Sequence, residues 1–372
     1  MKILVAGDFV PYNRVIKSIS DKDFSFFDEI REINKTIDYS IVNLEAPIVI
    51  DQKARPIKKS GPNLRCTKGA MEAIKYAGFD CVTLANNHLY DYGNEGYLDT
   101  INTCNEYGID YVGVGDNLED AKKILYKKIK DKIIAIINFC ENEWSIATET
   151  TSGANPLSIV QNHYQIKEAR NNADYVIVIV HGGKERYQLP TPRMKETYRF
   201  FIDSGADVII NHHQHCYSGY ETYNGKPIVY GIGNFCFDAP SDKPTAMWKE
   251  GYVVVIELEN IISFKIIPYE QCGKNLCVRI IDERESFDKK INEINNIIQN
   301  DSLLNKSFKE KSMELSESYI MLLEPYAGNK YFNYLYKKKL LPSFVKRNKR
   351  IIMNLIRCES HRDFLLEMLN RK

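Results

Sequence analysis

The stretch FDCVTLANNHLYDYG, residues 79–93, contains the pattern that determines the fold. A short apolar run, Val82–Ala85, stops at the polar pair Asn87 and His88. A run of this length that contains Val and Thr is typical of a buried strand. The helical pattern Asn94–Tyr107 follows almost at once. The stretch therefore predicts a strand with polar side chains at its carboxyl end, followed by a helix.

The same unit recurs on both sides of this stretch. Further short runs rich in Val and Ile are Ile3–Ala6, Tyr39–Leu44, Tyr111–Val114, Ile133–Asn138, Tyr175–Val180, Val208–Ile210 and Ile228–Gly231. Helical patterns between them are Lys68–Ala77, Gln165–Asn172 and Arg193–Ser204. Such alternation predicts an α/β fold with a sheet layered by helices.

The pattern changes after Gly251. Gly251–Leu258 and Ile262–Pro268 predict a hairpin that closes the domain, and the helical patterns that follow are Ser286–Asn300, Leu303–Leu323 and roughly Lys346–Asn370. We place a boundary near residue 283, with an α/β domain at 1–282 and a helical, basic extension at 283–372. Residues 330–372 contain 12 Lys and Arg against 3 Asp and Glu, a balance of +9, whereas the whole chain carries +1.

Composition limits the class of protein. The 372 residues are 44% hydrophobic and 27% charged, which is typical of a globular chain with a real core. The net charge of +1 gives no reason to expect a nucleic-acid partner. Nine cysteines without a CxxC pair favour a reduced, cytoplasmic protein. No apolar stretch approaches the ~20 residues of a membrane span, so association with the inner face of a membrane would be peripheral.

Residues with metal-ligand chemistry follow the predicted strands. Asp8, Glu45, Asn87 and His181 each come directly after one, and the His-rich stretch at 212–215 follows another. The carboxyl ends of strands form the binding crevice in open α/β sheets. The chain has only 7 histidines, and five of them lie in these motifs. Packing alone explains this joint placement poorly, so the sequence predicts one shared site.

Six motifs in order carry a family resemblance: AGDF (6–9), NLEAP (43–47), LANNHLYDYG (84–93), HGGKE (181–185), NHHQH (211–215) and YGIGNF (230–235). Together they resemble the CapA family of capsule synthesis proteins, which includes PgsA of poly-γ-glutamate synthesis. The resemblance covers about Met1 to Pro268. It implies a metallophosphoesterase-like layered α/β sandwich, here followed by the helical C-terminal extension.

The resemblance also implies a two-metal site. It places Asp8 and His215 at one metal and Asn87, His181 and His213 at the second, with Glu45 bridging them. His88 takes the position of the acid that protonates the leaving group, and Asp91 is its candidate partner. Oxygen and imidazole ligands suit one or two ions of Mn, Zn, Fe or Mg.

Two positions depart from the superfamily's general pattern. Val10 stands where a further His ligand is expected, and Glu45 replaces a shorter Asp. The first metal can therefore be weak, absent or replaced by a substrate group.

Other polar residues are secondary candidates. Lys59 and Arg65, with Lys58, flank a Gly-Pro loop and are interpreted as substrate-binding, although a solvated loop explains them equally simply. Glu185 is a candidate catalytic base or ligand-orienting residue, with helix capping as the alternative. Asn234 is a candidate substrate-binding residue that could instead orient a site histidine or form a turn.

These observations predict a metal-dependent hydrolase or transferase that acts on an anionic small molecule or polymer in capsule, surface-polysaccharide or poly-γ-glutamate biosynthesis. The alternative is a non-hydrolytic accessory or binding component of a polymer-synthesis complex. Capsule-synthesis proteins are expected partners in either case. The basic tail, with aromatic residues among its charges, could dock on an anionic membrane surface or bind nucleic acid, or it could be an ordinary solvated helical face.

Overall fold

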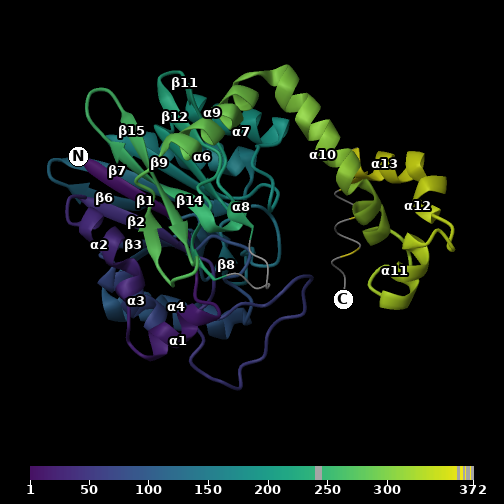
Figure 1. Ribbon diagram of the computed structural model, residues 1–372, viewed down its shortest axis with the longest axis horizontal. Helices are drawn as coiled ribbons and strands as arrows, with labels where there is room; N and C mark the ends of the chain where they lie inside the picture. The colour runs from purple at the N-terminus through teal and green to yellow at the C-terminus, as the bar shows by residue number, and fades with distance from the viewer. Residues whose placement is uncertain (239–244, 358–360, 363–364, 366–368, 370–372) are drawn as a thin grey trace. The chain divides into compact units, whose positions relative to one another are not determined.

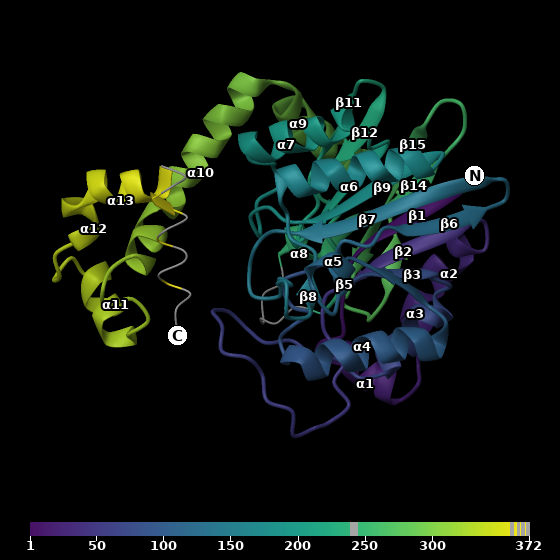
Figure 2. The same ribbon diagram turned by 180° about the vertical axis from the view of Figure 1, so that it is seen from behind.

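The computed structural model describes residues 1–238, 245–357, 361, 362, 365 and 369 (Figures 1 and 2). The chain divides into two compact units, Met1–Leu304 and Asn305–Lys372. This division falls after the sequence boundary near residue 283, because helix α9 (Glu285–Gln299) buries Phe287 and Ile291 among side chains of the first unit. The end of the last predicted helix, toward Asn370, lies partly outside the described residues.

The first unit contains two large mixed sheets. The eight-stranded sheet has the order β16-β15-β14-β1-β2-β3-β4, with β13 also paired to β1. Its strands are β1 (Lys2–Val10), β2 (Tyr39–Leu44), β3 (Cys81–Thr83), β4 (Asp110–Val112), β13 (Asn234–Phe237), β14 (Glu250–Glu257), β15 (Ser263–Gln271) and β16 (Val278–Ile280). Strands β1 to β4 run parallel to one another, so their carboxyl ends meet at one edge.

The six-stranded sheet has the order β11-β12-β10-β9-β7-β6. Its strands are β6 (Leu125–Ile129), β7 (Lys132–Cys140), β9 (Tyr175–His181), β10 (Val208–His212), β11 (Tyr220–Tyr223) and β12 (Lys226–Val229). The pairs β7–β9, β9–β10 and β10–β12 are parallel. A separate two-stranded sheet consists of β5 (Val114–Gly115) and β8 (Gly153–Ala154).

The two sheets pack face to face between outer layers of helices (Figure 2). Side chains alternate along a strand, so Ile3 and Val5 of β1 point to the space between the sheets, where they pack in one core with Ile177 of β9. Leu4 and Ala6 face the helical layer on the other side. The predicted layered α/β sandwich with a helical C-terminal region is therefore confirmed.

The helices of the first unit surround the two large sheets. They are α1 (Arg14–Ser20), the short 3-10 helix η1 (Ser25–Phe27), α2 (Asp28–Asn34), α3 (Gly69–Tyr76), α4 (Gly93–Tyr107), α5 (Leu118–Ala121), α6 (Ile159–Asn172), α7 (Pro192–Asp203), α8 (Ala246–Lys249) and α9. Several of them, such as α3 and α6, cover the outer faces. Helix α10 (Asp301–Leu322) begins in the first unit. The second unit also contains α11 (Lys330–Lys337), α12 (Phe344–Arg347) and α13 (Lys349–Arg357). Across the described residues, every helix is too short or too polar to cross a bilayer.

The predicted strand Tyr111–Val114 is divided between β4 and β5. Gly113 separates them with φ +92, and a Cβ at this position would lie 2.3 Å from Oδ1 of Asn138. The predicted hairpin is confirmed as β14 and β15, paired from Glu250↔Glu270 to Glu257↔Ser263.

Gly7, directly before Asp8, offers a test of how tightly the chain is packed at this end of β1. A Cβ on Gly7 would lie 2.0 Å from the carbonyl oxygen of Gly233. Because backbone atoms cannot rotate away, we expect Gly7→Ala to destabilise the protein by ~3 kcal/mol. Urea denaturation measures this. Gly225→Ala is the control for an open position: its Cβ would meet nothing within 4 Å, so only the positive φ of +75 should cost an alanine, about 1 kcal/mol. Equal losses for both variants would contradict the close approach at Gly7.

Candidate metal centre

Five strands from the two large sheets bring their predicted site residues to one place. The buried residues that meet there are Asp8 on β1, Glu45 after β2, Asn87 after β3, His181 at the end of β9, and His213 and His215 after β10. His181 pairs with His212 in the sheet register, which aligns the ends of β9 and β10. The parallel direction of these strands is therefore what assembles residues that are far apart in the sequence.

His181 lies at the centre of one group of ligand atoms. Its Nε2 is 3.0 Å from Oδ1 of Asn87, 3.1 Å from Nδ1 of His213 and 3.3 Å from Oε1 of Glu45. At most one proton can lie between two facing imidazole nitrogens of neutral rings. Four electron-pair donors that converge in this way form a set suited to a divalent cation.

Asp8 and His215 form a second group beside the first. Nδ1 of His215 is 3.5 Å from Oδ2 of Asp8, and its Nε2 is 3.7 Å from Oε1 of Glu45. Asn234 holds the same ring, with its Oδ1 2.9 Å from Nδ1 of His215. A donor at Nδ1 leaves Nε2 as the nitrogen with a free electron pair. Glu45 thus lies between the two groups, where a bridging ligand would be.

The backbone is strained at this point. His213 has φ 84 and His215 has φ 54, both in the left-handed region that most residues avoid. The turn also directs the N–H of His213 to Oδ2 of Asp8 at 3.2 Å. Strain of this kind persists where the surrounding structure fixes it, and it gathers at functional sites.

Glu45 provides the test of whether a cation fits. Its carboxylate is fully buried, and among the described residues no hydrogen-bond donor reaches either of its oxygens. A buried carboxylate without hydrogen bonds is costly, and nitrogen lone pairs from His181 and His215 surround this one. A cation would satisfy all of these groups at once, so the residues fit a metal.

The directions of the pKa shifts at this site agree with metal binding. Burial, followed by repulsion from Glu45, raises the pKa of Asp8 to about 8. Burial also raises the pKa of Glu45 and lowers those of His181 and His213 well below the usual value. Burial alone would lower the pKa of His215, but the carboxylates of Glu45 and Asp8 raise it. Without a cation, the carboxylates of this site therefore hold protons more firmly than usual, and the His181 and His213 rings beside them stay neutral.

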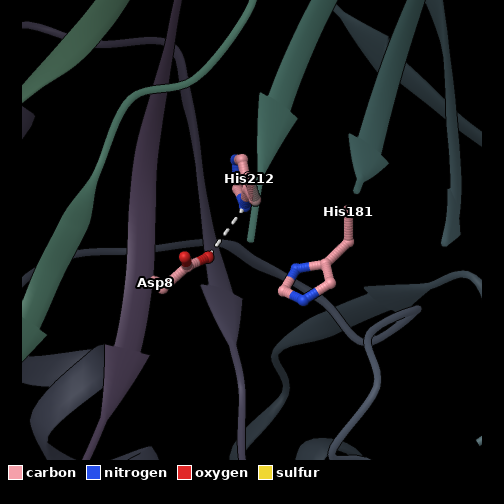
Figure 3. Close-up of side chains that lie close together, drawn as sticks. All are labelled: Asp8, His181 and His212. Atoms are coloured by element: carbon pink, nitrogen blue, oxygen red, sulfur yellow. Dashed lines mark ion pairs between the residues drawn. The ribbon is translucent and has the colours of Figure 1, made fainter. Parts of the chain in front are cut away.

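His212 belongs to the cluster although the sequence analysis left it out of the ligand set. Its ring is fully buried, and within the described chain neither nitrogen has a hydrogen-bond partner. Figure 3 shows the ring facing the Asp8 carboxylate, at 3.5 Å from Nδ1 to Oδ1, with His181 beside them. Asn43, within the NLEAP motif, was also missed, and its amide donates to Oδ1 of Asp8 at 2.8 Å.

A buried chain of polar groups supports His88. Nδ1 of His88 lies 2.7 Å from Oδ2 of Asp91, and Nζ of Lys59 pairs with the other oxygen of Asp91. Lys59 also approaches Nδ1 of His88 at 3.2 Å. Nδ1 is thus engaged, so Nε2 is the ring nitrogen left to exchange a proton. Lys59, predicted to bind substrate, is almost fully buried in this ion pair.

A cavity of ≈ 420 Å³ opens beside the cluster. Its lining residues are Tyr12, Lys59–Leu64, Asn87, His88, Glu143, Glu185, Arg186, His215, Phe237 and Trp248. Glu185 therefore lies where the sequence placed it, at the site. Arg65 does not line the cavity and instead donates to Gln52 at 3.3 Å. Asn234 holds His215, which was one of its two alternative roles.

The family model for the bacterial capsule synthesis protein PGA_cap matches residues 2–239. The chain belongs to this family. The matched region contains every residue of the metal cluster, and the resemblance inferred from the six motifs is confirmed.

Relatives in Bacillus are similar over somewhat more than half of the chain. The capsule biosynthesis protein CapA of Bacillus anthracis is 34% identical over 212 residues, which cover 55% of this chain and 51% of that protein. The PGA biosynthesis protein CapA of Bacillus subtilis (strain 168) is 34% identical over 217 residues, or 58% of this chain and 57% of that one. The chain thus spans little more than half the length of these relatives. Among solved structures, a phosphatase from Mycoplasma pneumoniae has a TM-score of 0.49 at 15% identity, covering 77% of this chain and 98% of that one.

Proposed function

We propose that this chain is a metal-dependent hydrolase or transferase that acts on an anionic substrate in capsule or poly-γ-glutamate biosynthesis. The observation that carries the chemistry is the buried Glu45 carboxylate, which has no hydrogen-bond donor among the described residues and lies between histidines on both sides. Membership of the family and the names of the two Bacillus relatives support the pathway.

The proposed ligands divide as the two groups do. Asn87, His181 and His213 would hold one cation and Asp8 and His215 the other, with Glu45 shared. The chemistry that a divalent cation held by these residues would supply is polarisation of a substrate oxygen and a lower pKa, toward ~7, for a bound water. The chain's own contribution is to keep His181 and His213 neutral by burial, so that their nitrogens are ready as ligands.

His88 is the proposed proton donor to the leaving group. It lines the cavity, and Asp91 fixes its orientation through Nδ1, so the transferable proton would be on Nε2. Lys59 pairs with Asp91 inside the protein, so the buried carboxylate has a cation beside it.

Replacement of His88 tests this role. We expect His88→Asn to lower turnover by about 10²–10⁴-fold, because a positioned acid contributes that much, while bound metal stays unchanged. The asparagine amide can still donate to Asp91, which protects the fold. The measurement is release of nitrophenol from aryl phosphate mono- and diesters with Mn²⁺. Unchanged turnover, or metal lost together with activity, would remove His88 from this role.

The non-hydrolytic alternative has one observation in its favour. Val10 occupies the position at which the superfamily's general pattern has a further His ligand. Its side chain is buried in the apolar core beneath the helical layer of the eight-stranded sheet and offers no ligand. The first cation would then have only Asp8, Glu45 and His215 close together, with His212 next to Asp8. Purified protein that binds metal and poly-γ-glutamate, yet cleaves no phosphoester and transfers no glutamyl group, would favour this alternative.

A further inference from the structure

The second unit has a highly one-sided charge. Residues 330–357, which include α11, α12 and α13, contain nine Lys and Arg and no Asp or Glu. Every Lys and Arg from Lys330 to Arg350 is exposed. Like charges at this density repel one another, so a run without acidic residues favours a partner that supplies negative charge.

Large apolar side chains are exposed on the same segment. Tyr331 is 67% exposed, Leu340 69% and Ile351 63%. On α13, Ile351, Ile352, Leu355 and Ile356 recur with helical spacing and form one apolar face, while Arg350 lies on the other side and Lys349 lies at the edge of the face beside Ile356. Ile351 and Ile356 remain exposed at both edges of this face. Apolar faces of this kind mark interaction surfaces.

The exposure does not come from an unfolded chain. Glu324, buried in the second unit, accepts hydrogen bonds from the hydroxyl of Ser343 and from the N–H of Phe344 at 3.0 Å. These bonds fix the start of α12. The Tyr326 ring packs against Tyr336 at 5.9 Å, and its hydroxyl donates to the carbonyl of Pro342 at 2.7 Å. The exposed residues therefore belong to a formed surface.

We propose that residues 330–357 form a docking surface for an anionic lipid membrane. Basic side chains beside an exposed apolar face are the features by which an amphipathic helix lies in the headgroup layer. The aliphatic residues Leu340, Ile351 and Ile356 favour lipid over nucleic acid, because acyl chains bury such side chains whereas bases gain most from stacking on aromatic rings. This inference does not rest on the proposed metal chemistry.

Vesicle sedimentation with the full chain tests the proposal. The protein should bind vesicles of phosphatidylcholine mixed with phosphatidylglycerol, bind phosphatidylcholine alone much less, and dissociate as salt rises. The charge variant combines Lys346→Glu, Arg347→Glu, Lys349→Glu and Arg350→Glu. We expect it to bind at least about tenfold more weakly. The double variant Ile351→Ser, Ile356→Ser should also bind vesicles more weakly, but its binding should still fall as salt rises.

The matched control makes the same change of net charge elsewhere. It combines Lys17→Glu, Lys53→Glu, Lys128→Glu and Lys167→Glu, all at exposed positions of the first unit. Equal loss in the control would overturn the proposal, as would equal binding to neutral and anionic vesicles. Tight binding to a single-stranded oligonucleotide with none to vesicles would assign the surface to nucleic acid instead. His213→Ala should bind vesicles as the unaltered chain does. A negative vesicle result would therefore not contradict the proposed metal site, and loss of the metal site would not contradict the docking surface.

Discussion

Elemental analysis of His213→Ala should find the protein almost free of the metal that the unaltered chain retains. Nδ1 of His213 faces Nε2 of His181 at 3.1 Å, so the substitution removes one of the converging donors. Even an outer partner of a metal ligand typically contributes 10–100-fold to affinity, and we expect a direct ligand to contribute at least about 100-fold. Asn87→Ala should behave in the same way, because its Oδ1 lies 3.0 Å from the same nitrogen.

His163→Ala is the matched control. Its ring stacks on Phe200 with centroids 5.4 Å apart, and its Nδ1 lies 2.8 Å from the hydroxyl of Ser204, outside the cluster. This variant also loses an imidazole but should keep its metal. If His213→Ala and Asn87→Ala retain as much metal as His163→Ala, these residues are not ligands and the proposed function loses its basis.

The convergence of the site could be predicted because it follows from strand direction. Each of β1, β2, β3, β9 and β10 has a polar site residue near or just after its carboxyl end, and parallel strands place such ends at one edge. Edge strand β6 was missed, since its sequence LYKKI combines apolar residues with exposed lysine and resembles a loop.

The polar partners within the site could not be predicted in the same way. Lys59 looked like surface charge in a Gly-Pro loop, but the fold buries it against Asp91, which lies 32 residues later. No local pattern links the two. The position of His212 could not be predicted either, because the positive φ values of His213 and His215 determine which rings of NHHQH face Asp8.

Thermal melting should show opposite pH dependence with and without metal. The folded, chelated protein keeps a proton on Asp8 up to a pKa of about 8, whereas the unfolded chain has lost it near its ordinary value of 3.8. Between pH 6.5 and 8 the folded state therefore binds more protons than the unfolded state. Its free energy of unfolding should fall by ~1.4 kcal/mol per pH unit for this one group. The raised pKa of His215 acts in the same direction.

Below pH 6.5 an opposite contribution grows. Burial lowers the pKa values of His181, His212 and His213, so the unfolded chain binds protons that these buried rings do not bind. The chelated protein should thus be most stable near pH 6. With Mn²⁺ in excess, melting temperature should instead rise from pH 6.5 to 8, since a cation competes with the proton on Asp8 and binds only the ionised carboxylate. His213→Ala with Mn²⁺ should follow the chelated curve. Identical slopes for the unaltered chain with EDTA and with Mn²⁺ would show that no cation binds at Asp8.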